Sequence, residues 1–360
     1  MEARKKSIVI LLNCFLVVVS VQATIAIASP YIEYSSILTV GYIDSDFSSI
    51  QEAVRYADEG ATIYIKNGIY NEIITIDMPL TLIGENKEHT IIVPTSEQNS
   101  YAVHSRAPNV TIKELSISNK GPGMYTTGLK ITGNKTLVES CIFYDNPIGI
   151  AIWSSNNTVV NSTFYGCNDE GIAILGTASN PLTHNHIKQC IFYENTDGIE
   201  LQHASNTIIE YCEFFDNNHA GIDIIGSYNK KNKIINCLFT NNKVFGLYMI
   251  RSTQTLIDSC VFVDSPLMFR LSSDVYMQSS IFESLQLYDT TIEFFDYEPD
   301  DKKNIHAVNS VFNFAQEPLL NSRLEDVLRR NNTPRFQRIT LLVQNILERI
   351  NNFILVTRRI

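Results

Sequence analysis

The stretch CIFYENTDGIELQHASNTIIEYCEFFDNNHAGIDIIGS, residues 190–227, contains one pattern twice. Cys190-Ile191-Phe192 is followed 22 residues later by Cys212-Glu213-Phe214. Asp197-Gly198-Ile199-Glu200 is followed by Ala220-Gly221-Ile222-Asp223. A repeat of this length is typical of solenoid proteins, in which each repeat forms one coil that stacks on the next. The acidic residues of the pattern therefore either lie on a hydrated wall or form a site.

The repeat extends through most of the chain. Short runs rich in Val, Ile and Thr alternate with period two, which excludes pairs of amphipathic helices. We predict an all-β fold over residues 45–315: a single-stranded right-handed parallel β-helix, with coils about 4.8 Å apart. Phenylalanine marks each coil, 20 to 30 residues after the last, at Phe143, Phe164, Phe192, Phe214, Phe239, Phe262, Phe282 and Phe312.

Cysteines and asparagines recur in phase with this pattern. A column of cysteines gives one ligand per coil in a line, which suits neither a metal site nor disulfides, so we predict an inward ladder of free thiols. It comprises Cys141, Cys190, Cys212, Cys237 and Cys260. Asparagine tolerates the left-handed conformation of a sharp corner, which we expect at Asn134, Asn157, Asn206 and Asn232.

The start of the repeat region predicts a capping helix. Ser49 and Glu52 are in capping-box register, and Ile50, Ala53, Val54 and Ala57 form one apolar face. A helix here would cover the core of the first coil. We expect strands to follow it at Thr62–Ile65, Ile73–Ile76 and Leu80–Ile83.

This opening resembles that of pectin methylesterases and of NosD-like proteins. The resemblance rests on Ile50-Gln51-Glu52-Ala53-Val54, Gly68-Ile69-Tyr70-Asn71-Glu72 and Leu80-Thr81-Leu82-Ile83-Gly84. The later coils resemble the NosD and carbohydrate-binding/sugar-hydrolase group of the pectin lyase-like superfamily, so that the likeness covers roughly residues 45–315. It implies the fold, whereas one scaffold hosts many activities. The esterase motifs Gln-Asp-Thr-Leu and Asp-Phe-Ile-Phe-Gly are missing.

The segment Asn195-Thr196-Asp197-Gly198-Ile199-Glu200 is similar to the Asn-Thr-Asp-Gly-Ile-Asp motif of polygalacturonases. That family also carries an Asp-Asp pair, a Gly-His-Gly and an Arg-Ile-Lys, none of which is present here. Asp197, Glu200 and Asp223 are therefore catalytic candidates that lack the rest of the family's constellation.

The acidic residues are expected to share one outward face. In Gly-Ile-x-Ile the aliphatic side chains point inward, so the residue between them points out. Glu200 and Asp223 should then lie on neighbouring coils, with Asp197 at the corner. Stacked carboxylates raise one another's pKa or recruit a cation, so we expect a sugar or Ca²⁺ here, with no required cofactor. The predicted ligand-binding residues are Glu170, Asp197, Glu200, His203, His219, Asp223 and Tyr248.

A separate loop, His184-Asn185-His186, has two alternating histidines. Copper is the metal that the NosD-like resemblance would imply for it. No methionine or thiol lies in register with these histidines, so the motif alone specifies no site.

The N-terminus predicts export. Arg4, Lys5 and Lys6 precede an apolar run, and Ala26-Ile27-Ala28 is a small-x-small cleavage site, so residues 1–28 form a signal peptide or an uncleaved membrane anchor. Residues 29–44 form a linker. We expect an extracytoplasmic protein, secreted or on the cell surface.

Charge separates the body from the tail. The full chain carries −10; without residues 1–28, which hold three basic residues and one acid, it carries −12. Residues 316–360 hold eight arginines and four acids, a balance of +4, which leaves about −16 for the body. An acidic body excludes nucleic acid as its partner.

The tail 316–360 is predicted to be a basic amphipathic helical segment. Its helix has Thr333 as N-cap and Pro334 as first residue. Three roles stay open for it: a cap on the last coil, contact with an anionic membrane surface, or docking of a protein through residues 334–355.

Three functions stay open for the whole protein. The first is a carbohydrate-binding or scaffold protein for a polysaccharide or cell-envelope glycan. The second is a polysaccharide hydrolase or lyase that uses the acidic face, and the third is a copper-handling accessory protein.

Overall fold

The computed structural model describes residues 37–94, 101–121, 123, 126–272, 274–282, 285–288, 292–294, 305–308 and 311–312. All of them lie in one compact unit, Ser36–Ile360. The predicted signal peptide, the first half of the linker, the tail and Cys14 lie outside the described residues. Within the described residues, no helix is long and apolar enough to cross a membrane.

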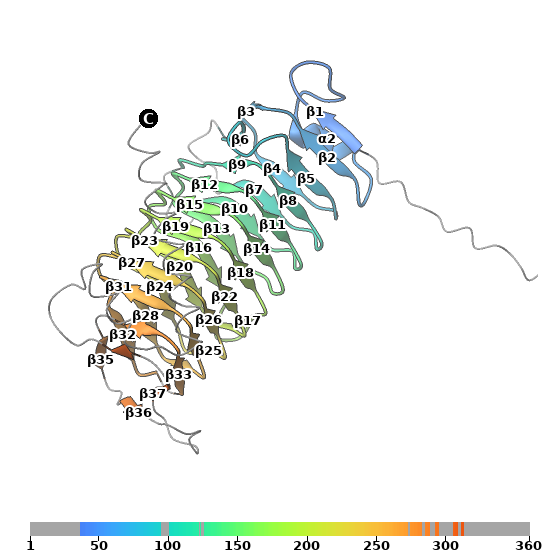
Figure 1. Ribbon diagram of the computed structural model, residues 1–360. Helices are drawn as coiled ribbons and strands as arrows, with labels where there is room; N and C mark the ends of the chain where they lie inside the picture. Colours follow the sequence, from blue (N-terminus) through green and yellow to red (C-terminus); the bar gives the residue numbers. More distant parts are fainter. Residues whose placement is uncertain are drawn as a thin grey trace, which may run out of the picture. The chain divides into compact units, whose positions relative to one another are not determined.

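The chain folds into coils whose strands form three long parallel sheets (Figure 1). Each coil contributes one strand to each sheet in turn, as β11, β12 and β13 do. The 13-stranded sheet has the order β1 (Ile37–Val40), β2 (Thr62–Ile65), β5 (Thr81–Gly84), β8 (Thr111–Lys113), β11 (Leu137–Glu139), β14 (Thr158–Val160), β18 (His186–Lys188), β22 (Ile208–Glu210), β26 (Lys233–Ile235), β30 (Leu256–Asp258), β33 (Val275–Gln278), β37 (Ile305–Val308) and β36 (Ile292–Phe294).

The 11-stranded sheet contains the phenylalanine column. Its order is β3 (Gly68–Tyr70), β6 (Thr90–Ile92), β9 (Ser116–Ile117), β12 (Ile142–Tyr144), β15 (Thr163–Tyr165), β19 (Ile191–Tyr193), β23 (Glu213–Phe215), β27 (Leu238–Thr240), β31 (Val261–Val263), β34 (Ile281–Phe282) and β38 (Val311–Phe312).

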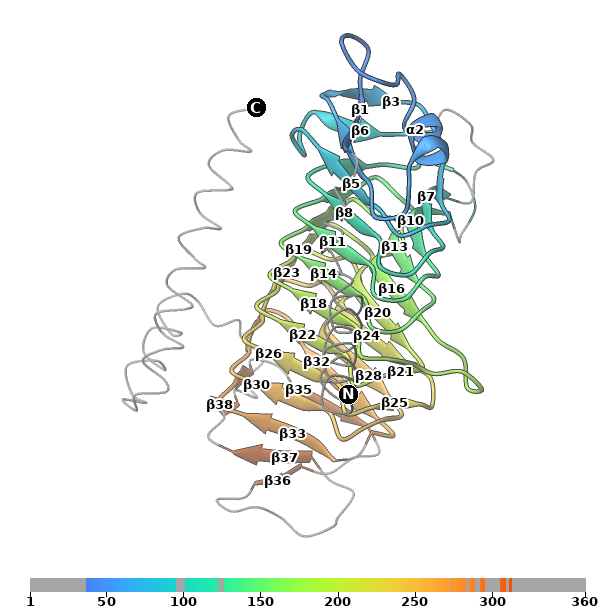
Figure 2. The same cartoon turned by 90° about the vertical axis from the view of Figure 1, so that its right-hand side faces the viewer.

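The 10-stranded sheet contains the acidic residues. Its order is β35 (Leu285–Tyr288), β32 (Leu267–Arg270), β28 (Phe245–Ile250), β24 (Ala220–Ile225), β20 (Asp197–Gln202), β16 (Glu170–Leu175), β13 (Ile148–Ile152), β10 (Thr127–Ile131), β7 (Tyr101–Ser105) and β4 (Ile74–Ile76). Figure 2 shows the 13-stranded and 10-stranded sheets meeting along one edge of the coils. Two short pairs lie at this edge: β17 (Leu182–Thr183) with β21 (Ala204–Ser205), and β25 (Asn229–Lys230) with β29 (Ser252–Thr253).

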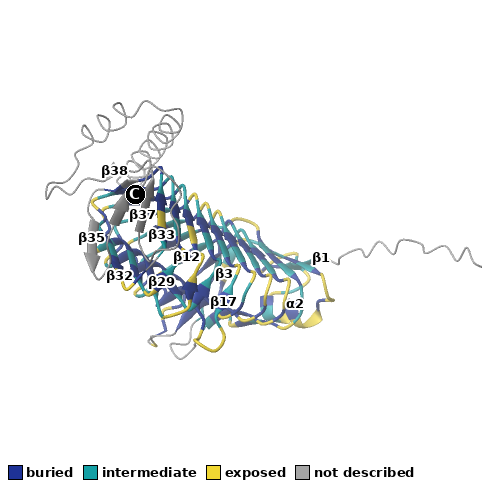
Figure 3. Ribbon diagram, turned by 90° about the horizontal axis from the view of Figure 1, so that it is seen from below, coloured by how far each residue is buried: buried dark blue, intermediate teal, exposed yellow. Residues whose placement is uncertain are grey.

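The parallel β-helix predicted from the repeat is confirmed. Phe143 to Phe282 stack with ring centroids 4.2–5.2 Å apart inside the coils. The glycine column packs against these rings: a Cβ on Gly198 would lie 2.7 Å from a ring carbon of Phe214 and 2.5 Å from the carbonyl oxygen of Gly221. The buried residues fill the interior and the exposed ones lie at the turns (Figure 3).

The corners are built differently from the prediction for three of the four asparagines. Only Asn206 has a positive φ, 52°. At Asn134 the left-handed residue is the next one, Lys135. Asn157 and Asn232 are buried, and their amides bond to other coils: Asn157 Nδ2 donates to Asn185 Oδ1 at 3.0 Å. A buried amide satisfies backbone groups of two coils, which a left-handed turn residue does not.

A second ladder of buried amides lies at the corner between the 11-stranded and 10-stranded sheets. Asn195 Nδ2 donates to Asn217 Oδ1 at 3.1 Å, and Asn217 Nδ2 donates to Asn242 Oδ1 at 2.9 Å. Cys167 occupies the same corner position one coil earlier, where its N–H donates to Asn195 Oδ1 at 3.0 Å.

The ladder of free thiols is confirmed for the five cysteines in phase. All are buried and unbonded to one another by disulfides. Each follows a residue with positive φ, such as Tyr211 before Cys212, so that one left-handed residue turns the chain and the next side chain points inward. Burial raises the pKa of the Cys141 thiol to about 12.

Helix α2 (Ile50–Tyr56) begins after its N-cap Ser49 and buries Ile50, Ala53 and Val54 against the first coils. The Ser49 hydroxyl accepts from the Glu52 N–H at 3.2 Å, as the capping-box register predicts. Glu72, from the Gly-x-Tyr-x-Glu segment, also accepts bonds from the Ser49 hydroxyl and from the N–H groups of Ile50 and Gln51, at 2.7–2.9 Å. Glu72 therefore joins the Gly-x-Tyr-x-Glu segment to the start of the helix.

Candidate functional site

The predicted register of the acidic face is confirmed. Glu200 on β20 is the Cα partner of Asp223 on β24, and Asp223 is the partner of Tyr248 on β28. Glu170 on β16 is the partner of Asp197 on β20. The flanking Ile199, Leu201, Ile222 and Ile224 are fully buried in the main core. The acidic residues therefore lie on the opposite, outer face of the 10-stranded sheet.

This outer face is more enclosed than an outward column suggests. Glu170, Asp197 and Asp223 are only 6%, 6% and 7% exposed. Beside them, Ile148, Ala151, Ala173 and Leu175 form an apolar cluster separate from the main core. The carboxyl groups are thus flanked by apolar side chains, and the interpretation as a hydrated acidic wall does not fit these three residues.

Asp197 and His219 form the best-defined contact of the site. Asp197 Oδ1 lies 2.8 Å from His219 Nδ1 and accepts a 2.7 Å bond from the Ala220 N–H. His219 lies in the corner just before β24, and Asp197 lies on β20, one coil earlier. The contact therefore joins two neighbouring coils. The bond to Asp197 raises the pKa of His219, against the opposing effect of burial.

Aromatic rings border the same group. The ring of His219 meets Phe245 and Tyr248 edge-on, with centroids 5.7 and 5.9 Å apart. Phe245 and Tyr248 stack on each other at 4.9 Å. Phe245 was not among the predicted site residues, although it occupies the position of Asp197 two coils on.

Burial raises the pKa of four carboxyl groups on this face, those of Asp169, Glu170, Glu200 and Asp223. Desolvation, followed by the charges of neighbouring acids, raises the pKa of Glu170 to about 10 and that of Asp223 to about 7. Desolvation also raises the pKa of Glu200 to about 7, although a hydrogen bond with Glu170 opposes this shift. Asp169, which the sequence reasoning missed, bonds to Glu170 and has its own pKa raised by burial. Asp169 directly precedes Glu170 in the sequence, and this adjacency could have identified it.

Two carboxylate oxygens of the site are buried without any hydrogen-bond partner: Asp223 Oδ1 and Glu170 Oε2. A buried acceptor left unpaired is costly, and such atoms often mark a place where a ligand, ion or proton is held. One ligand atom each from Asp197, His219 and Asp223 lies within 4.8 Å of the others, a geometry that could hold a cation.

The other predicted residues lie apart from this cluster. His203 follows the far end of β20, where its ring contacts Tyr228 with centroids 5.9 Å apart. His186 is on the 13-stranded sheet and its Nε2 lies 3.0 Å from Glu210 Oε1. His184 is a turn residue with φ 58°. Within the described residues, neither histidine of this loop belongs to a group of three or more ligand-type side chains.

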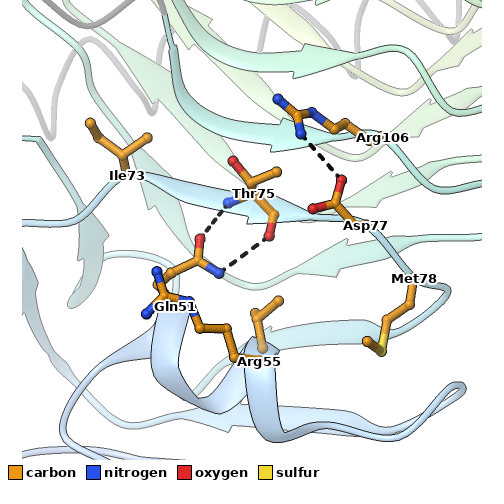
Figure 4. Close-up of a pocket in the computed structure, with 8 residues that line it drawn as sticks. Gln51, Arg55, Ile73, Thr75, Asp77, Met78 and Arg106 are labelled. Carbon is orange, nitrogen blue, oxygen red and sulfur yellow. Dashed lines mark hydrogen bonds and ion pairs between the residues drawn. The ribbon is translucent and has the colours of Figure 1, made fainter.

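A cavity of about 480 Å³ lies at the other end of the same sheet, beside helix α2 (Figure 4). Gln51 joins the helix to β4: its side chain accepts from the Thr75 N–H at 2.6 Å and donates to the Thr75 carbonyl at 3.4 Å. Arg106 and the exposed Asp77, which also line the cavity, form an ion pair at 3.4 Å. Its lining holds no residue of the acidic cluster.

Among solved structures, the fold is similar to a rhamnogalacturonan lyase (15% identity, 84% of this chain and 94% of that chain covered, TM-score 0.61). It is also similar to an alginate lyase from Paenibacillus sp. str. FPU-7 (13%, 77% and 99%, TM-score 0.54). A third is the A-module of the Azotobacter vinelandii mannuronan C-5 epimerase AlgE4 (12%, 75% and 92%, TM-score 0.53).

At these identities the likeness establishes the fold alone. A search of curated protein sequences finds no match. The family model described as "Right handed beta helix region" matches residues 32–190 and 184–313, which is most of the chain. The protein therefore belongs to the right-handed β-helix family.

Proposed function

We propose that this protein is an exported polysaccharide-binding β-helix protein whose glycan site is the outer face of β20, β24 and β28. The observation that carries the proposal is one column of three consecutive coils, in which Glu200, Asp223 and Tyr248 are register partners. Carboxyl groups bond to sugar hydroxyls, and aromatic rings stack on the apolar face of a sugar ring. Few polar groups beside an aromatic surface are typical of ligand sites.

Two further observations support the proposal. Phe245 and Tyr248 stack at 4.9 Å, which places aromatic rings next to the carboxyl groups. Several structural neighbours are named as enzymes of polysaccharides, including lyases of rhamnogalacturonan and alginate. The signal-like residues 1–28 would bring the protein to the compartment where such glycans occur.

The test is binding of residues 29–360 to alginate, polygalacturonate, xylan and a neutral β-glucan, by affinity electrophoresis and calorimetry. We expect at least one polysaccharide to bind, and Tyr248→Ala and Asp223→Asn each to weaken binding by about tenfold or more. Tyr211→Ala and Asp258→Asn are the matched controls, because Tyr211 follows β22 and Asp258 ends β30, both strands of the 13-stranded sheet. Failure of the wild type to bind any glycan, or an equal loss in the controls, contradicts the proposal.

A second candidate function is catalysis on the same polysaccharide, and the Asp197–His219 contact favours it. A histidine held by a carboxylate is the usual arrangement of an oriented general base. Glu200 and Asp223, with pKa values near 7, could neutralise a substrate carboxylate or donate a proton. This combination suits proton abstraction in a lyase or epimerase. Glycosidic hydrolysis would need two carboxyl groups placed on either side of the scissile bond, one of them protonated.

Turnover is tested with the polysaccharide that binds, by reducing-end release, ultraviolet absorbance of unsaturated products and NMR of the sugar configuration. If the protein is an enzyme, His219→Gln abolishes product formation while Tyr211→Ala keeps it. Binding without turnover leaves the binding function and excludes the enzyme.

A further inference from the structure

The cluster of Asp197, His219 and Asp223 has a second role open to it. We infer that these three side chains bind one divalent transition-metal ion of the Mn²⁺ or Zn²⁺ class. Their ligand atoms lie within 4.8 Å of one another. The inference deepens the proposed function, since the ion would lie on the face to which we assign the glycan, but it rests on protein contacts that need no glycan.

The backbone fixes the position of each ligand. Asp197 is the first residue of β20, and Asp223 lies within β24. His219 lies in the corner between β23 and β24. The Ala220 N–H donates to Asp197 Oδ1 at 2.7 Å. Such outer-shell bonds hold a ligating carboxylate in one orientation. The site therefore needs no rearrangement of the sheet to form.

An independent observation points to a missing ligand. Asp223 is more than nine-tenths buried, and its Oδ1 has no hydrogen-bond partner. An unpaired carboxylate oxygen in such surroundings carries a large desolvation penalty. A divalent cation between Asp223, Asp197 and His219 provides that oxygen with a partner and neutralises the two carboxylates.

The donor set favours a transition metal over Ca²⁺, the cation expected from the sequence. Ca²⁺ takes six to eight oxygen ligands, whereas this site provides an imidazole nitrogen. The His219 side chain is 35% exposed, which leaves one side open to water or to a sugar oxygen. Binding through Nδ1 requires the neutral tautomer with its proton on Nε2, and it replaces the contact between His219 and Asp197 by metal–ligand bonds.

The test is calorimetric titration of EDTA-stripped protein, residues 29–360, with MnCl₂, ZnCl₂ and CaCl₂ in the absence of glycan. We expect one site per chain, with Mn²⁺ or Zn²⁺ bound about tenfold more tightly than Ca²⁺. Asp223→Asn and His219→Gln should each weaken binding about tenfold or more. His186→Gln is the matched control, because His186 also lies 3.0 Å from a carboxylate, that of Glu210, on another sheet.

Two further measurements keep the test decisive. Circular dichroism and urea unfolding show whether each variant folds. If Asp223→Asn does not fold, Asp223→Glu takes its place: it keeps the carboxylate and should retain part of the metal affinity. Electron paramagnetic resonance of bound Mn²⁺ should show coupling to a histidine nitrogen that disappears in His219→Gln.

Absence of Mn²⁺ and Zn²⁺ binding, unchanged binding in Asp223→Asn, or a preference for Ca²⁺ overturns the inference. Glycan binding is measured separately with EDTA present. Retained glycan binding in protein that binds no metal refutes the metal site alone, and metal binding without any glycan binding refutes the proposed function alone.

Discussion

Glu170 on β16 and Asp197 on β20 are direct register partners in neighbouring coils, and both carboxyl groups are buried. Burial disfavours the charged form of a carboxyl group, and neighbouring acids disfavour it further. Burial, followed by the charges of Asp169, Glu200 and Asp197, raises the pKa of Glu170 to about 10. The stability of the fold therefore depends on pH through Glu170.

The first prediction concerns this dependence. Because the pKa of Glu170 is higher in the folded than in the unfolded chain, the unfolded chain releases a proton above pH 4.5 that the folded chain keeps until about pH 10. Stability should therefore fall as the pH rises through this window, by at most about 1.4 kcal/mol per pH unit for this group.

Glu170→Gln, which cannot ionise, should flatten the curve and be more stable than the wild type at pH 8. Urea unfolding at pH 5, 6.5 and 8 with EDTA checks this. An unchanged slope in Glu170→Gln would contradict the assignment of the proton, and Glu194→Gln serves as the control.

The second prediction concerns the thiols. Burial raises the pKa values of Cys141 and Cys167 to about 12, and all six cysteines of the described chain are buried and free. Native protein lacking residues 1–28 should react with a thiol reagent only at the rate of unfolding, and six thiols should react at once in denaturant. Peptide mapping identifies the labelled residues. Rapid native labelling of Cys212 or Cys237 would show that the column does not face inward.

The third prediction concerns the amide ladder. Asn217 accepts two bonds from Asn195 and donates to Asn242 and to the Phe192 carbonyl. Asn217→Ala leaves buried partners unpaired and should reduce the free energy of unfolding by about 1–3 kcal/mol. Asn218→Ala, at the neighbouring exposed position, should change it by less than about 0.5 kcal/mol. Equal effects of both substitutions in urea unfolding would argue against the ladder.

The fourth prediction concerns the N-terminal helix. Glu72 accepts bonds from the Ser49 hydroxyl and two helix N–H groups, and its charge also interacts favourably with the helix dipole. Glu72→Ala should reduce stability by about 1–2 kcal/mol. Hydrogen exchange should then accelerate at Ile50 and Gln51. The exposed Glu88→Ala is the control, and exchange that is unchanged in Glu72→Ala would show that Glu72 does not cap the helix.

The sequence predicts the fold well because stacking forces like residues into columns. One side chain lies over its copy in each coil, so Phe143 and its equivalents, the thiols and the Gly-Ile pattern all read directly as positions in the coil. The helix near Ile50 is predicted from local signals, an N-cap serine and one apolar face. Its contact with Glu72 is not predicted, because that contact joins residues more than 20 positions apart.

The site is less predictable from the sequence. Register alone places Glu200 beside Asp223 and Glu170 beside Asp197. Periodicity could not show that the outer face is buried, since burial depends on what surrounds a side chain and not on its direction. Nor could it separate His219, which contacts Asp197, from His203, which follows the far end of the same strand. The two histidines are equally close to the acidic pattern in sequence, and only corner geometry distinguishes them.

Between β11 and β34, most of the difference in coil length falls on one corner. Two residues always connect the 13-stranded to the 11-stranded sheet between β11 and β34, whereas the connection from the 10-stranded sheet back to the 13-stranded sheet varies from 4 residues after Arg270 to 10 after Leu175. An insertion at this corner leaves the phenylalanine stack and the amide ladders in register. Since that corner follows the end of β16, β20 and β24 that lies away from Asp197 and His219, evolution can change its length without disturbing the site or the interior that holds the coils together.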